Sequence, residues 1–217
     1  WTDEFQTTYD LKFDITSQIS THHLLKSGID FRLYSLDVDD REEVHPGGSY
    51  HLSKYKTKPF QGAFYIQDKM EYDYLIVNAG LRLGYDDPTL FNDELIKFWS
   101  DPSEWKSSET KVKPFLRLAP RLGVAIPVTD LTIFHFNYGI FYQSALYRHR
   151  YSYSDVDHNL NAIKPQLGNP NLEPEKTTSY ELGLKQQIGN DLSVEFNLWL
   201  KKQANIVGSQ WIPTFTD

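Results

Sequence analysis

Apolar and polar residues alternate along eight separate segments of this sequence, and each such segment fits a β-strand with one apolar face. In residues 134–142, for example, Phe134 and Phe136 share one parity, while His135 and Asn137 share the other. The full set of segments is 9–16, 26–33, 60–70, 75–85, 116–126, 134–142, 180–188 and 193–201. Several of them run for ten residues or more, compared with about 5–6 for an average globular strand. The pattern therefore predicts an all-β, antiparallel fold built of long strands.

The connections between these segments alternate in length. Short connections lie at 20–23, 71–74, 127–130 and 189–191, and long connections lie at 37–58, 87–112 and 143–176. This layout is typical of an up-and-down transmembrane β-barrel with short periplasmic turns and long extracellular loops. A soluble sandwich also alternates, but loops beyond about 12–15 residues are uncommon in compact domains. The sequence thus predicts a transmembrane barrel segment of about eight strands, whose outer face contacts outer-membrane lipid.

Composition excludes several other classes of protein and site. The formal net charge of −7 argues against a nucleic-acid partner, which would need a basic face. The absence of cysteine excludes disulfides and thiolate metal sites. A transmembrane helix needs about 20 successive apolar residues, whereas the longest apolar runs here, such as 124–128, have only a few. If the chain crosses a membrane, it must therefore do so with strands.

Three stretches of sequence, taken in order, resemble one known family. Residues 168–175 (GNPNLEPE) and then 178–183 (TSYELG) are similar to the loop-to-strand motif of TonB-dependent outer-membrane receptors. Residues 65–69 with 81–86, and 118–124 with 136–139, resemble two preceding hairpins of the same barrel. The two prolines at 170 and 174 hold the residues before them extended, which fits a loop that re-enters the wall at a fixed register. The resemblance extends from about Leu24 to Ile206.

The resemblance implies that residues 1–217 are a fragment of the C-terminal β-barrel domain of such a receptor, without its plug domain and remaining strands. It further implies energy-coupled uptake of a scarce ligand (a metal chelate, vitamin, glycan or peptide) across the outer membrane of a Gram-negative bacterium. The energy would come from the TonB energy-coupling complex acting on the missing plug. No enzyme activity and no cofactor are implied. A passive porin-like or adhesin barrel and a soluble β-sandwich binding module are the alternatives.

Six charged residues fall on the polar parity of the predicted strands, which would face the lumen of a barrel. They are Arg32, Arg82, Arg117, Arg121, Lys185 and Glu195. Two roles are open for these residues. In the first, they belong to a hydrated lumen wall, and their charges pair with each other or with the plug. In the second, some of them steer an anionic ligand through the pore.

The long connection at 143–176 contains a stretch of donors and aromatic rings that suits contact with an extracellular ligand. The predicted ligand-contact residues are Arg148, His149, Arg150, Tyr151 and Tyr153. A metal site is not predicted, because the adjacent His22 and His23 would point to opposite faces of a strand. No P-loop, G-x-S-x-G or H-E-x-x-H motif occurs, so no catalytic residue is predicted.

Overall fold

The computed structural model describes residues 2–43, 50–88, 113–151, 169 and 171–209, and in this part nine antiparallel strands form one sheet. The strands are β1 (Thr2–Gln18), β2 (His23–Glu43), β3 (Tyr50–Thr57), β4 (Phe60–Tyr72), β5 (Leu75–Asp87), β6 (Phe115–Thr129), β7 (Thr132–Gln143), β8 (Glu175–Ile188) and β9 (Leu192–Ala204). One short helix, α1 (Tyr147–Tyr151), follows β7 in the same described ranges. The all-β antiparallel prediction is confirmed, and within the described ranges no helix is long and apolar enough to cross a membrane.

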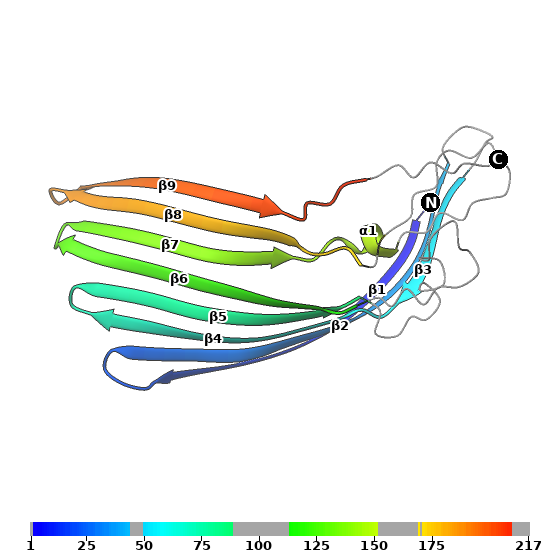
Figure 1. The fold of residues 1–217 in the computed structure, drawn as a ribbon, viewed down its shortest axis with the longest axis horizontal. Coiled ribbons are helices and arrows are strands. Elements are labelled where there is room, and N and C mark those ends of the chain that lie inside the picture. Colours follow the sequence, from blue (N-terminus) through cyan, green and yellow to red (C-terminus); the bar gives the residue numbers. More distant parts are fainter. Residues whose placement is uncertain (1, 44–49, 89–112, 152–168, 170, 210–217) are drawn as a thin grey trace.

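The strands follow one another across the sheet in chain order, except that β3 and β4 both pair with β2. β3 pairs with the end of β2 from Leu36 to Glu43, and β4 pairs with the part from His23 to Leu33. Figure 1 shows the tight turns gathered at one end of the sheet and α1 at the other end. Because the strands lie in one sheet and not in two packed layers, the described part of the chain does not form a β-sandwich.

The register keeps the two parities of every strand on opposite faces. Ile29 lies opposite Phe64, which lies opposite Leu83, and Leu83 lies opposite Leu118. Further along the sheet, Leu182 on β8 lies between Phe136 and Leu198. Polar and small residues form equivalent rows on the other face, so that the eight segments of the sequence share one apolar face and one polar face.

The prediction of a long loop at 37–58 was wrong, because most of this segment forms a β-hairpin. β2 continues to Glu43, and β3 returns from Tyr50 to Thr57. Lys56 and Asp37 join the two strands by an ion pair of 2.8 Å. The ninth strand of the sheet comes from this hairpin. Of the two other predicted loops, 89–112 and 152–168 lie outside the described residues.

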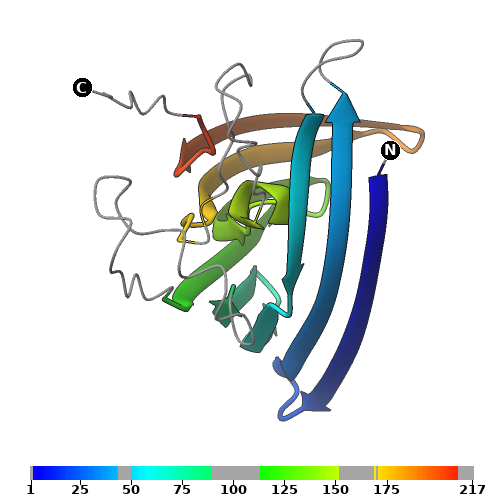
Figure 2. The ribbon, with the colours of Figure 1, turned by 90° about the vertical axis from the view of Figure 1, so that its right-hand side faces the viewer.

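The small buried core lies where α1 packs against the polar face of β2 and β3. Leu36, Val38, Tyr55 and Tyr151 are buried there, and Tyr34 and Tyr147 pack against them. Figure 2 shows the curved sheet with α1 inside its concave side. The polar face of the sheet is therefore the concave one, as the inner face of a barrel wall would be.

Candidate functional site

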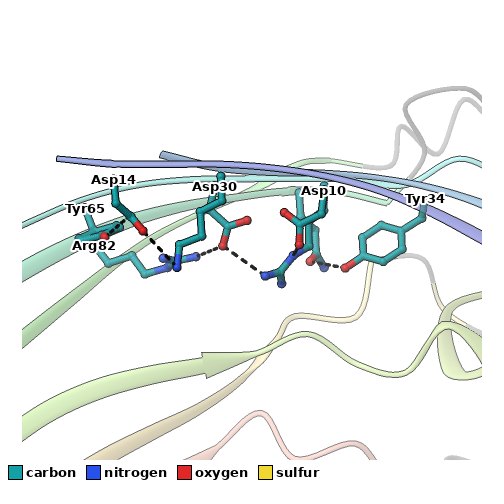
Figure 3. Close-up of polar contacts among 9 residues, drawn as sticks. Asp10, Asp14, Asp30, Tyr34, Tyr65 and Arg82 are labelled. Atoms are coloured by element: carbon teal, nitrogen blue, oxygen red, sulfur yellow. Dashed lines mark hydrogen bonds and ion pairs between the residues drawn. The ribbon is translucent and has the colours of Figure 1, made fainter. Parts of the chain in front are cut away.

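The candidate site is a network of charged side chains on the concave face of β1, β2, β4 and β5. The guanidinium of Arg32 donates from Nε to Asp10 at 3.0 Å and from Nη2 to Asp30 at 3.4 Å. Arg82 donates to the same oxygen of Asp30 at 3.3 Å. One step further along the strands, the Tyr65 hydroxyl donates to Asp14. Figure 3 shows these side chains projecting to one side of the sheet.

A second, buried network surrounds Asp86 at the end of β5. Arg150 of α1 donates to both carboxylate oxygens of Asp86, at 2.9 and 3.3 Å, and Arg117 of β6 donates at 3.1 Å. The Ser144 hydroxyl adds a bond of 2.7 Å. The Arg150 side chain is 0% exposed and that of Asp86 is 3% exposed. One carboxylate is thus shared by two guanidiniums, and among the described residues neither arginine has a partner for its buried Nε.

Aromatic rings complete the attachment of α1 to the wall. Tyr147 contacts Tyr34 with ring centroids 5.3 Å apart, and Tyr151 contacts Tyr55 at 5.7 Å. The Tyr151 hydroxyl also donates to the carbonyl of Pro88. Burial raises the pKa of Tyr151, and burial together with the neighbouring Tyr34 raises the pKa of Tyr147. Both phenols therefore stay neutral throughout the physiological range.

A hollow of about 290 Å³ separates the two networks. Its charged lining residues are Asp30, Arg32, Arg82, Asp86, Arg117 and Arg121. Its lining also includes small residues: Ala63 and Gly84, which lie opposite each other on β4 and β5, and Ala119 on β6, which lies opposite Arg82. Charged side chains and small residues therefore line the same hollow.

The structure brings four of the six predicted lumen-facing residues to this hollow: Arg32, Arg82, Arg117 and Arg121. Lys185 and Glu195 lie opposite each other on β8 and β9, away from the hollow, and a role for either in steering a ligand stays a prediction. The sequence reasoning missed Asp10, Asp30 and Asp86 as partners of the arginines, and Ser144 as a further donor to Asp86. Asp86 has the parity of Arg82, so continuing the alternation by four residues would have placed it on the same face.

The predicted ligand-contact residues differ in their surroundings. Arg148 is exposed, His149 is half-buried, and Arg150 and Tyr151 are buried in the attachment of α1. Tyr153 lies outside the described residues. Contact of any of these five residues with a ligand stays a prediction.

Potential metal ligands do not gather in the described ranges of the chain, where no group of three or more His, Cys, Asp or Glu side chains could hold an ion. His22 stacks on Tyr72 with centroids 5.0 Å apart, and His23 Nδ1 lies 2.7 Å from Asp68. These contacts lie at the end of the sheet with the tight turns, where His22 precedes β2, His23 begins β2, and Tyr72 ends β4.

The comparison with known families agrees with this geometry. All of residues 1–217 match the family model described as TonB dependent receptor-like, beta-barrel. The chain belongs to this family. Its members are receptors and transporters. None of the curated proteins matches the chain.

Solved structures of the family share the fold at low sequence identity. The FrpB iron transporter of Neisseria meningitidis, in its apoprotein form, is 13% identical over 91% of this chain, with a TM-score of 0.56. A mutant of the ferric enterobactin receptor PfeA of Pseudomonas aeruginosa, in complex with enterobactin, is 13% identical over 93%, with a TM-score of 0.60. The copper transporter OprC is 14% identical over 92%, with a TM-score of 0.60. The chain spans 29%, 27% and 30% of these three proteins, respectively.

Proposed function

We propose that the chain supplies wall and extracellular loops to a receptor that takes up a scarce ligand across the outer membrane of a Gram-negative bacterium. The ligand is a metal chelate, a vitamin, a glycan or a peptide, and the energy comes from the TonB complex. The remaining strands and a plug domain belong to the same receptor. The chain itself has no catalytic role. Membership of the receptor family and the two-faced sheet together support this proposal.

The uncovered apolar face is the observation that carries the proposal. Large apolar side chains such as Leu83, Leu182 and Phe196 stay exposed on that face. A soluble monomer rarely exposes a contiguous apolar patch of more than a few hundred Å², whereas a bilayer would cover this face. Strands β4 to β9 have 12–15 residues, and a membrane-spanning β-strand needs only about 9–11.

The free edges of the sheet support a larger barrel. Within the described residues, β1 pairs only with β2, and β9 pairs only with β8. An unpaired strand edge is a template for aggregation, and closing the barrel removes it. We therefore place the remaining strands of the wall between β9 and β1, with the plug inside.

The predicted ligand-contact residues are assigned two different roles. Arg148 and His149 are accessible on α1 and would contact the ligand, and Tyr153 is assigned with them from the sequence. Arg150 and Tyr151 are buried and would instead hold α1 against the wall, where Asp86 and Pro88 bind them. The helix would thus present its exposed side to the interior of the receptor.

Spin labelling tests which face of the sheet contacts lipid. Since the chain has no cysteine, single cysteines at Leu81, Phe136 and Leu184 can carry labels on the apolar face, and cysteines at Arg82 and Lys185 can carry them on the polar face. In the full-length receptor in vesicles, we expect apolar-face labels to collide mainly with oxygen dissolved in the bilayer. Polar-face labels should collide mainly with a water-soluble nickel reagent. The reverse pattern, or no difference between the sets, would rule out the proposed orientation.

Growth experiments test energy-coupled uptake. The gene is deleted in its own host, and growth is compared while iron, copper, a vitamin, a glycan or a peptide in turn limits it. We expect deletion to slow growth on one limiting nutrient, and deletion of tonB to slow growth on the same nutrient. Extra copies of the receptor gene should not restore growth without tonB. Restoration without tonB would instead indicate a passive pore.

A further inference from the structure

Part of the hollow between the two charged networks is lined by small residues, which leave space there. Ala63 lies opposite Gly84, and Ala119 lies opposite Arg82 on the next strand. A Cβ atom added at Gly84 would meet no heavy atom within 4 Å. Gly80, four residues earlier on the same strand, differs, since an added Cβ there would already contact Gln67 at 3.6 Å. The space over Gly84 is therefore a local feature of the wall.

The charges around the hollow do not balance. Arg32 and Arg82 share Asp30, Arg32 also binds Asp10, and Arg117 shares Asp86 with Arg150. Arg121 has no carboxylate partner in the described part of the chain, and its guanidinium lies 4.8 Å from the centroid of the Phe141 ring. Four guanidiniums and two carboxylates thus line the hollow, which carries an excess of positive charge.

One arginine that lines the hollow also has an unused hydrogen-bond donor. The Nε atom of Arg117 is buried without a partner among the described residues. Buried polar groups usually have a partner, and a donor left without one costs free energy. An oxyanion placed in the hollow would supply acceptors to the arginines at its rim, because a guanidinium matches carboxylate and phosphate groups well.

We propose that the hollow binds the carboxylate or phosphate group of a small solute that passes along the concave face. This proposal rests on the proposed uptake function, and it narrows the transported ligand to a molecule that carries an oxyanion. Arg121 and Arg82 bind the group from β6 and β5, and Gly84 provides the space. A volume of about 290 Å³ exceeds what one acidic side chain of the protein would fill and is close to the lower end of small-molecule pockets.

Titration calorimetry on the full-length receptor in detergent micelles tests the proposal directly. The probes are inorganic phosphate and succinate, with glucose as a neutral reference. We expect both anions to bind, glucose not to bind, and binding to weaken as sodium chloride is raised, because salt screens exposed charges. If neither anion binds, the proposal is wrong. The hollow would then have no affinity for anions, or an acidic side chain of the protein would already occupy it.

Matched variants locate the binding site. Arg121→Gln should weaken anion binding about tenfold, which is typical for the loss of one charged hydrogen bond. Lys185→Gln removes the same charge from the same face outside the hollow and should leave the affinity unchanged. Gly84→Val should abolish binding by filling the space, whereas Gly80→Val should not. Equal losses in the members of either pair would place any binding elsewhere and overturn the proposal.

This experiment is independent of energy coupling, because it measures binding to the isolated receptor. If the receptor binds both anions in the hollow but supports growth without tonB, the proposed uptake mechanism is wrong and the proposed anion site stands. If growth depends on tonB but neither anion binds, the proposed anion site is wrong and the uptake mechanism stands.

Discussion

Replacing Asp86 with asparagine is expected to release α1 from the wall. The asparagine side chain would carry no charge, and Arg150, whose side chain is 0% exposed, would lose its only described carboxylate partner. Breaking a buried ion pair by removing one partner costs about 3–5 kcal/mol. Since about 1.4 kcal/mol corresponds to tenfold in an equilibrium constant, the amides of residues 147–151 should exchange their hydrogens at least a hundredfold faster. Hydrogen–deuterium exchange of the full-length receptor, read by mass spectrometry, measures this change.

Asp30→Asn is the matched control for Asp86→Asn. Asp30 also binds two arginines, but the side chains of Arg32 and Arg82 are 41% and 38% exposed, so water can solvate their charges when the carboxylate is lost. Exchange in α1 should therefore stay at the wild-type rate in Asp30→Asn. If Asp86→Asn also left α1 protected, the aromatic contacts of Tyr147 and Tyr151 would be sufficient to hold the helix.

The two-faced sheet could be predicted from the sequence because alternation is a local property. Each strand from β4 to β9 carries its apolar residues on one parity, and the antiparallel register then joins these residues into rows without any further information. Leu182, for example, was assigned to the apolar face from its own segment, and it lies between Phe136 and Leu198. Tight turns could also be located, because they interrupt the alternation over only a few residues.

The β2–β3 hairpin could not be predicted in the same way, because its apolar residues change faces. Leu33 has the parity of the apolar face, whereas Leu36 and Val38 have the opposite parity and are buried under α1. This switch ends the period-two pattern, and the acidic residues that follow resemble loop sequence. The strand continues because β1 and β3 pair with it on its two sides and α1 covers Leu36 and Val38, and all of these are contacts that no local pattern reveals.

The charged site could be predicted only in part, because alternation assigns a residue to a face but does not identify its partners. The arginines of the hollow fall on the polar parity, so the alternation assigned them correctly to one face. Partners from other elements were missed because such pairing depends on which elements are neighbours, whereas Asp30 lies only two residues before Arg32 on β2. Arg150 comes from α1 and Asp86 from the end of β5, 64 positions earlier, and no local pattern in the sequence connects them.

Replacing Leu182 with arginine is expected to disfavour insertion of the receptor into a bilayer. Leu182 lies near the middle of β8 on the apolar face, between Phe136 and Leu198. An arginine at the midplane of a membrane barrel costs about 2–4 kcal/mol, because its charge must be solvated within hydrocarbon. Denaturant titration of the full-length receptor folded in lipid vesicles should show a loss of stability of this size.

Asn137→Arg tests whether the effect depends on the face and not on the charge alone. Asn137 is the neighbour of Phe136 on β7, but it lies on the polar face opposite Glu181. An arginine there would stand in water beside a carboxylate, so the stability of this variant should stay within about 0.5 kcal/mol of the wild type, as for most surface substitutions. A loss in Asn137→Arg with none in Leu182→Arg would mean that the polar face meets the lipid. Similar losses in both variants would mean that neither face is in contact with a watery interior, and the sheet could then not be the wall of a transport barrel.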